Sequence, residues 1–210
     1  MKIALISVAP PYRGGISKHT TILAQKLSID HSIDIINYKR QYPQFLFPGK
    51  TQYLENISNY NSKFRIIDTI NPISWYKTAN LIICKNYDLV IFRFWNPFFS
   101  PALGVIAKII KKKSCTTKLI SLCDNIIPHE KIPLSNYFIN FLFNKLDGHI
   151  VQSSQTEKEL KHIVNYPIYK KSFHPIYNTF KEKINKKEAR AKLKVESENI
   201  ILYFGIIRDY

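Results

Sequence analysis

Two glycines that follow an apolar run are the first residues with a possible chemical role. Gly14 and Gly15 stand between residues 3–6 and a segment with helical spacing. A glycine backbone can turn sharply or approach a ligand closely, and the first N–H groups of a helix attract anions. Arg13 beside them would add a charged fork for a phosphate or carboxylate. The motif is neither GxGxxG nor a P-loop, so an anion site and a plain tight turn both stay open.

A second group of polar residues falls in the stretch 121–131, after an apolar run. Asp124, Asn125, His129 and Glu130 lie there within seven positions. Such groups can orient a substrate hydroxyl or accept its proton. Asp124 or Asn125 could equally cap the turn that follows. The spacing of His129 and Glu130 is not that of metal ligands, and we predict no metal site.

Strand-like and helix-like segments alternate along the chain. Short apolar runs rich in β-branched residues predict buried strands at 2–8, 32–37, 88–95, 118–125 and 148–154. Apolar residues at helical spacing predict helices around 16–27, 75–83, 100–113, 134–146 and 154–163. This pattern predicts an α/β fold, a Rossmann-like doubly wound parallel sheet covered on both faces.

Notable residues follow the carboxyl ends of the predicted strands, where parallel sheets bind ligands. They are Gly14, Gly15, Trp95, Asp124, Asn125, Ser153 and Ser154. Their positions predict a cleft along this edge of the sheet. Ser154 and Glu157, three residues apart, also predict a capping box at the start of the last helix.

The charge of the chain favours an anionic partner. The formal net charge is +16, from 31 Lys and Arg against 15 Asp and Glu. A phosphorylated substrate or an acidic membrane surface would suit it, and so would a solvated surface with no partner. We predict no nucleic-acid partner, because the sequence has no zinc spacing, RNP-type motif or basic heptads. The aromatic helix 134–146 is expected to be buried, while Lys145 and the tract 108–113 leave a membrane contact open.

The cysteines and the N-terminus favour a cytoplasmic protein. The three cysteines form no CxxC motif and suit a reducing compartment: Cys84, Cys115 and Cys123. No run reaches the roughly 18 apolar residues of a membrane span. The start of the chain lacks a long h-region and a cleavage site, and reads as a first strand. The expected location is therefore the cytoplasm, with a peripheral position at the inner face of the plasma membrane left open.

The character of the sequence changes near residue 180. A charged stretch with one short helix precedes the apolar run 200–205, which predicts a new buried strand. We therefore expect a domain at 1–180, followed at 181–210 by a linker and the first strand of a second domain that is cut short. At the end of the second predicted strand, Lys39 and Arg40 replace the acidic residue that NAD requires, although they suit a 2′-phosphate.

Six stretches in order resemble the N-terminal half of family 4 glycosyltransferases, which have the GT-B fold. They are "APPYRGGISKHT" (9–20), "YKRQYPQFLFPGKTQY" (38–53), "INPISWYKTAN" (70–80), "LVIFRFWNPFFSPALG" (89–104), "CDNIIPHE" (123–130) and "LYFGIIRDY" (202–210). The resemblance implies two Rossmann-like domains that face a cleft, with the acceptor mainly on the first and the nucleotide-sugar donor on the second. It also implies retaining transfer to a glycan or lipid-linked acceptor without a metal cofactor.

The resemblance also implies roles for individual residues. Gly14 and Gly15 match the loop that approaches the donor diphosphate. Asp124 falls where many members carry a histidine or aspartate at the acceptor side of the anomeric carbon, and it is the expected catalytic residue. Gly205 and Arg208 match a donor-binding loop whose lysine and paired glutamates would follow Tyr210. We expect Arg13, Trp95, Asn125, His129, Glu130 and Ser153 to line the acceptor side of the cleft. The alternatives are a nicotinamide-dependent oxidoreductase and a non-catalytic remnant that binds an acceptor or a membrane.

Overall fold

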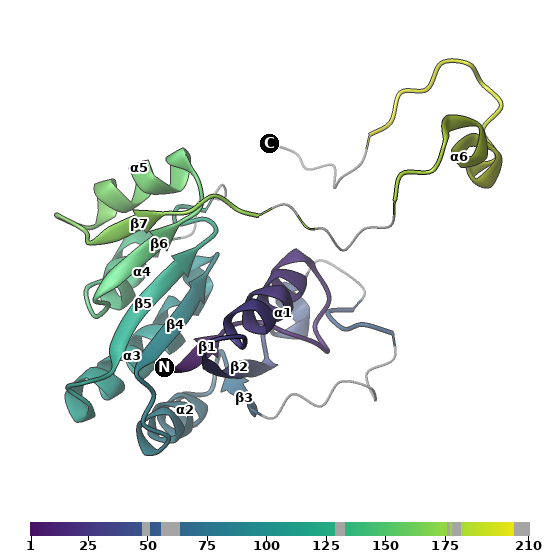
Figure 1. Cartoon of the computed structure of the whole chain (residues 1–210). Coiled ribbons are helices and arrows are strands. Elements are labelled where there is room, and N and C mark those ends of the chain that lie inside the picture. Colours follow the sequence, from purple (N-terminus) through teal and green to yellow (C-terminus); the bar gives the residue numbers. More distant parts are fainter. Residues whose placement is uncertain (48–50, 56–63, 129–132, 176, 178–181, 204–210) are drawn as a thin grey trace. The chain divides into compact units, whose positions relative to one another are not determined.

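The computed structural model of the chain describes residues 1–47, 51–55, 64–128, 133–175, 177 and 182–203 (Figure 1). Contacts within the chain divide it into two compact units, residues 1–174 and 175–210. The predicted residues His129, Glu130, Gly205 and Arg208 lie outside the described ranges.

The first unit is built on one sheet of seven parallel strands. The strands are β1 (Lys2–Ile6), β2 (Ser32–Arg40), β3 (Phe64–Asp68), β4 (Leu89–Phe94), β5 (Lys118–Cys123), β6 (Gly148–Val151) and β7 (Tyr169–Lys171). Their order is β3-β2-β1-β4-β5-β6-β7, and each neighbouring pair is parallel. Strands are added toward one edge from β1 to β3 and toward the other edge from β4 to β7. The order therefore reverses between β1 and β4, which is the switch point of a doubly wound Rossmann-like sheet. The predicted fold class is confirmed.

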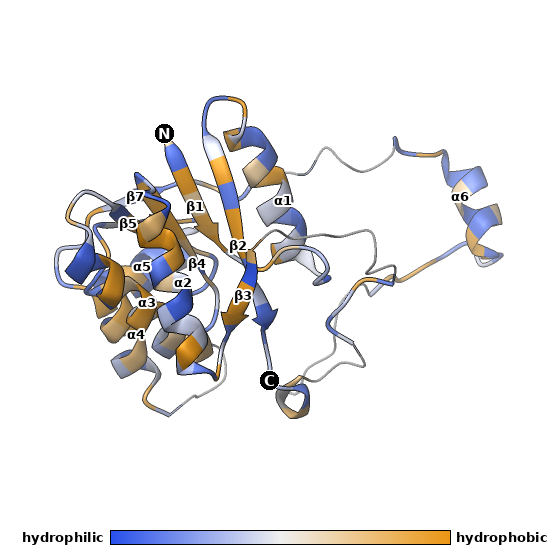
Figure 2. Ribbon diagram, turned by 90° about the horizontal axis from the view of Figure 1, so that it is seen from below, coloured by the Kyte–Doolittle hydropathy of each residue, from blue (hydrophilic) through white to orange (hydrophobic). Residues whose placement is uncertain are grey.

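Helices cover both faces of this sheet (Figure 1). They are α1 (Gly15–Leu27), α2 (Pro72–Cys84), α3 (Ser100–Lys113), α4 (Ser135–Phe143) and α5 (Ser154–Ile163). Leu23 and Ala24 of α1 pack with Leu5 on one face. The larger core on the other face includes Ile82 of α2, Ile106 of α3 and buried residues of α4 and α5. Figure 2 shows β1 as mainly hydrophobic, as expected for a central strand with both faces covered, and β2 as a mixture of hydrophobic and hydrophilic residues.

Several elements differ from the sequence predictions. The two outermost strands, β3 and β7, were not predicted, because they are short and carry charged residues. The capping box is wrong by one position: the side chain of Ser153, not Ser154, accepts the backbone N–H of Thr156 at 3.0 Å. The carboxylate of Glu157 instead binds Lys161 and Lys171.

The second unit contains one helix in its described part, α6 (Lys186–Leu193), which has no buried residue. Asn185 caps it by accepting the backbone N–H of Glu188 at 2.8 Å. Residues 200–203, where the sequence predicts a buried strand to begin, are irregular and exposed. The predicted strand is therefore not formed in the described part of this segment. Within the described ranges, no helix combines the length and apolar character needed to cross a bilayer.

Candidate functional site

The glycine turn lies at the switch point of the sheet, between β1 and α1. Gly14 has φ 120° and ψ 170°, a backbone conformation that residues other than glycine rarely adopt. It is the N-cap of α1 and offers no side-chain cap, and the first helical bond runs from the N–H of Lys18 to its carbonyl. The N–H groups of residues 15–17 therefore have no partner inside the helix. A Cβ added at Gly14 or Gly15 would meet nothing within 4 Å, so a ligand has room to approach both residues.

A segment distant in sequence is hydrogen-bonded to the turn. The backbone N–H of Arg13 donates to the carbonyl of Gln52 at 3.0 Å, and that of Leu54 donates to Pro11 at 2.8 Å. Tyr12 and Tyr53 form an antiparallel bridge, and their ring centroids are 4.9 Å apart. Segment 51–54 therefore forms one wall beside the glycine turn, while the side chain of Arg13 is exposed.

A buried arginine joins the ends of β4 and β5 at the same edge. The side chain of Arg93 is 1% exposed. It donates two hydrogen bonds to Asp124, from Nε to Oδ2 at 2.8 Å and from Nη2 to Oδ1 at 2.6 Å. The backbone N–H of Asp124 also donates to the carbonyl of Phe94 at 2.9 Å. Both carboxylate oxygens of Asp124 thus accept from Arg93, so this residue, the predicted catalytic group, is half of a buried ion pair.

His19 of α1 completes this cluster. It is buried, and its Nδ1 contacts Nη1 of Arg93. Because a guanidinium can only donate, Nδ1 must be the acceptor and the ring proton lies on Nε2. Burial lowers the pKa of His19 to about 4, the positive charge of Arg93 and the nearby His174 lower it further, and Asp124 has a smaller opposite effect. His19 is therefore neutral at pH 7.

The remaining predicted residues take different positions. Trp95 donates from Nε1 to the hydroxyl of Tyr42 at 3.3 Å, which connects the end of β4 to the chain after β2. Asn125 is exposed beside Asp124. Ser153 caps α5, and Thr156 of that helix donates to the carbonyl of Asp124 at 3.3 Å. The structure therefore brings the ends of β1, β4, β5 and β6 to one edge, with Ser153 in a structural capping contact.

Sequence reasoning missed several residues of this edge. Arg93 stands inside the apolar run 89–95, and a charge within a buried strand is a signal of a paired partner. His19 and Glu159 gave no such signal. One carboxylate oxygen of Glu159 accepts the backbone N–H groups of Ile126 and Ile127, each at 3.1 Å, and so holds the chain after Asp124.

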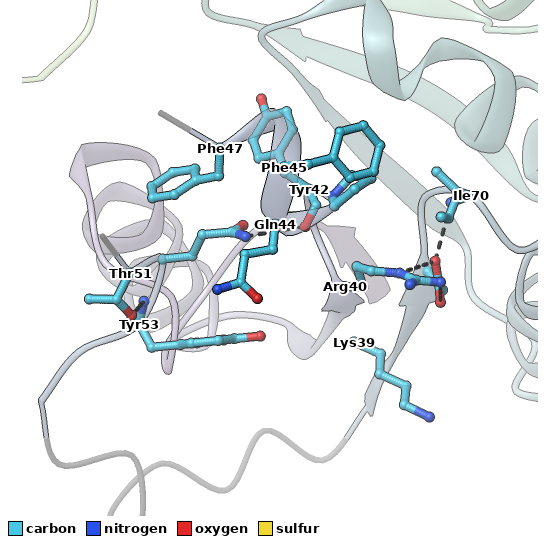
Figure 3. Close-up of a pocket in the computed structure, with 12 residues that line it drawn as sticks. Lys39, Arg40, Tyr42, Gln44, Phe45, Phe47, Thr51, Tyr53 and Ile70 are labelled. Carbon is cyan, nitrogen blue, oxygen red and sulfur yellow. Dashed lines mark hydrogen bonds and ion pairs between the residues drawn. The ribbon is translucent and has the colours of Figure 1, made fainter. Parts of the chain in front are cut away.

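Two adjoining hollows lie where β2 and β3 end, and Figure 3 shows the first of them. The first, here the aromatic hollow, has a volume of about 800 Å³ and is lined mainly by Tyr42, Gln44, Phe45, Phe47, Gln52 and Tyr53. The second, here the cationic hollow, has a volume of about 650 Å³ and is lined by Arg65, Asn71, Ser74 and Lys77, among others. Lys39 and Asp68 line both. Among the described residues, no three His, Cys, Asp or Glu side chains come together as metal ligands would.

Comparison with known proteins adds likenesses of structure. No family model and no curated protein sequence matches the chain. A sucrose-phosphate synthase from Thermosynechococcus elongatus aligns with a TM-score of 0.49 and 15% identity, over 85% of this chain and 91% of that chain. An alpha-glucosyltransferase in complex with UDP-glucose and DNA containing an abasic site gives 0.49 and 12%, over 82% and 42%. An alpha-glucosyltransferase with UDP and a mismatched 13-mer DNA gives 0.44 and 10%, over 73% and 37%. This chain spans less than half of these last two chains.

Proposed function

We propose that the chain is the acceptor-side domain of a retaining glycosyltransferase of the GT-B kind. The enzyme would transfer a sugar from a nucleotide-sugar donor to a glycan or lipid-linked acceptor, in the synthesis of cell-surface polysaccharide. The observation that carries the proposal is the open turn at Gly14 and Gly15, placed at the switch point of a doubly wound sheet. The motif resemblance of this turn and of the five other stretches supports the same assignment.

The chemistry of sugar transfer fits the groups around the turn. When the bond between the anomeric carbon and the diphosphate breaks, negative charge collects on the departing diphosphate. The uncapped N–H groups at the start of α1 and the exposed Arg13 would stabilise that charge. Asp124 would orient the acceptor hydroxyl as a hydrogen-bond acceptor. Its two bonds to Arg93 make it a poor candidate for a strong base.

The location and partners follow from the same proposal. The cysteines Cys84, Cys115 and Cys123 are free thiols, which supports a reducing cytoplasm. Lysines near the end of α3 and after α4 support a peripheral contact with an anionic membrane: Lys108, Lys112, Lys113 and Lys145. We propose no cofactor beyond the donor itself, as the resemblance implies.

Donor binding at the turn tests the proposal directly. UDP-glucose, present in one of the compared structures, is titrated into the whole chain while the backbone amides of residues 14–17 are followed by NMR. These amides are expected to shift. Gly15→Ala adds a methyl group in the open space of the turn at a residue with ordinary backbone angles, so it is expected to weaken binding about 10-fold without lowering stability. Ser135→Ala, at the first residue of α4, is the matched control.

Two outcomes would contradict the proposal. If the amides respond to NADPH and not to UDP-glucose, the sheet serves a nicotinamide cofactor and the chain belongs with oxidoreductases. If Gly15→Ala and Ser135→Ala bind UDP-glucose equally, the donor does not lie on the turn.

Retention of configuration is read by proton NMR from the anomeric signal of the product.

A further inference from the structure

The aromatic hollow and the cationic hollow are parts of one continuous surface. Both lie at the carboxyl ends of β2 and β3, and Lys39 and Asp68 line both of them. Their volumes, about 800 and about 650 Å³, are in the range of ligand sites. Any ligand that extends from one hollow into the other therefore passes Lys39.

The aromatic hollow has the groups that recognise a sugar ring. Figure 3 shows the rings of Tyr42, Phe45, Phe47 and Tyr53 around the same hollow as the amide of Gln44. The amide of Gln52 also lines this hollow. The side chain of Phe45 is 85% exposed, which is unusual for a large apolar ring. Aromatic rings pack against the C–H face of a sugar, while amides exchange hydrogen bonds with its hydroxyls.

One amide in this hollow has an acceptor without a partner. Nε2 of Gln52 donates to the carbonyl of Tyr42 at 3.2 Å, which fixes the orientation of the amide. Its Oε1 is buried and has no hydrogen-bond partner among the described residues. An unpaired buried acceptor is costly, and a small displacement of the Gln52 amide toward the hollow would let a sugar hydroxyl donate to it.

The cationic hollow carries positive charge without matching carboxylates. Among the described residues, no Asp or Glu pairs with Lys39, Arg65 or Lys77. Asp68 lines the hollow, but both its oxygens accept from Arg40, at 2.9 and 2.6 Å. The hollow therefore attracts an anion.

Arg65 is held in place by neutral groups. Its Nε donates to the carbonyl of Tyr38 at 3.1 Å, and its Nη2 donates to the hydroxyl of Tyr53 at 3.3 Å. The guanidinium also lies 5.4 Å from the ring centroids of both Tyr12 and Tyr53. A cation that is oriented before a ligand arrives loses less freedom on binding.

From these contacts we propose that the two hollows form one binding site for a saccharide that carries a phosphate or a carboxylate. The sugar ring occupies the aromatic hollow, and the anionic group lies between Lys39, Arg65 and Lys77. The wall of the site, segment 51–54, is hydrogen-bonded to residues 11–13 beside the glycine turn. We identify this saccharide with the acceptor of the sugar transfer. That identification rests on the proposed function, whereas the binding of the saccharide does not.

A phosphorylated dinucleotide is the rival occupant, because the end of β2 is where Rossmann folds hold a 2′-phosphate. Two observations favour the saccharide. Arg40, which would hold that phosphate, is already bound to Asp68. The glycine turn also lacks the third glycine of the dinucleotide motif. NADPH is therefore included as a probe.

Calorimetric titration of the whole chain tests the site with five probes. Glucose 6-phosphate and glucuronate carry the two anionic groups, methyl glucoside carries none, and inorganic phosphate and NADPH complete the set.

The double variant Lys39→Gln/Lys77→Gln is expected to weaken binding of the charged sugars about 5- to 30-fold. Phe45→Ala is expected to weaken it about 3- to 10-fold, by loss of ring stacking. The control Lys158→Gln/Lys170→Gln removes the same charge from α5 and from β7 at the opposite edge of the sheet, and is expected to change nothing.

Each outcome decides for or against the inference. Binding of either charged sugar that is weakened by the site variants and not by the control supports it, and the stronger of the two identifies the anionic group. The inference is overturned if methyl glucoside or phosphate alone binds as tightly as the charged sugars, or if NADPH binds more tightly than they do. It is also overturned if the control variant weakens binding as much as the site variants, or if no probe binds. If UDP-glucose binds the glycine turn while no saccharide binds here, only this inference fails. If saccharides bind here while the amides of the glycine turn respond to NADPH and not to UDP-glucose, only the proposed function fails.

Discussion

Removing the carboxylate of Asp124 is expected to destabilise the protein far more than removing the arginine it binds. The side chain of Arg93 is 1% exposed and that of Asp124 is 17% exposed. In Asp124→Ala the guanidinium stays buried without its counter-charge, which costs about 3–5 kcal/mol of unfolding free energy. In Arg93→Met the carboxylate left behind can be hydrated, and the loss is expected to be about 1–2 kcal/mol.

A double-mutant cycle separates the pair from its surroundings. In Arg93→Met/Asp124→Ala neither charge remains, so the double variant is expected to be about as stable as Arg93→Met alone. The coupling energy then equals the loss in Asp124→Ala, about 3–5 kcal/mol. Urea unfolding followed by circular dichroism at pH 7 measures all four proteins. The pair Arg40–Asp68 is the control, because it has the same two-bond geometry with an arginine that is 45% exposed, and its coupling is expected to be much smaller.

The refuting result is an Asp124→Ala variant within about 1 kcal/mol of the wild type, which would mean that Arg93 is hydrated or otherwise compensated. Additive effects in the cycle would refute the reasoning as well. The same experiment bears on catalysis, because activity lost in Asp124→Ala alone can result from unfolding. Activity is better compared between Arg93→Met and the double variant, which are expected to share one stability and differ only in the carboxylate.

Three further predictions concern other parts of the first unit. An added Cβ at Gly104 would lie 2.5 Å from a ring on α4, so Gly104→Ala is expected to lower the unfolding free energy by about 1–3 kcal/mol, as measured in urea. Burial lowers the pKa of both His19 and His149 to about 4 in the folded chain. Between about pH 6.5 and about pH 4 the unfolded chain therefore binds more protons than the folded chain, and the thermal midpoint is expected to fall as the pH drops through this range. His19→Gln/His149→Gln is expected to flatten this slope, and an unchanged slope would contradict the assignment. Vesicles with anionic lipid are expected to bind the chain in flotation assays, and Lys112→Gln/Lys113→Gln to weaken binding about 10-fold or more, whereas equal binding to neutral vesicles would contradict an electrostatic contact.

The central strands could be predicted from the sequence, and the outer strands could not. Strands β1 and β4 are buried on both faces, so they appear as continuous apolar runs. Strand β7, with the sequence Tyr-Lys-Lys, forms only because β6 supplies its hydrogen bonds. Pairing with β3 likewise accompanies the extension of β2 to Arg40, three residues beyond the predicted strand 32–37. Pairing between distant segments decides these strands, and local composition does not report it.

The candidate site divides in the same way. The glycine turn could be found because the backbone itself requires glycine at position 14. The partners of Arg93 lie 31 and 74 residues away, so the sequence could show a charge within a strand but not what neutralises it. The aromatic hollow is built mainly from the segments around Tyr42 and Gln52, which are joined by the bond from Nε2 of Gln52 to the carbonyl of Tyr42 and are held beside the glycine turn by the bonds between 11–13 and 51–54. The residue types were visible, but their convergence depends on the fold.

The net charge shows most clearly what the fold adds to composition. A value of +16 fits a uniformly charged surface as well as a binding site, and the sequence leaves both readings open. In the structure, carboxylates accompany several basic clusters: Glu157 binds two lysines, and Asp147 binds a third. Asp68 is the only carboxylate among the described residues that line the hollows, and it is occupied by Arg40, so no described carboxylate matches the charges of Lys39 and Lys77. Unmatched charge attracts an anion, and aromatic rings beside it favour an anion attached to a sugar. Part of the excess charge therefore lies at this edge of the sheet, next to the glycine turn.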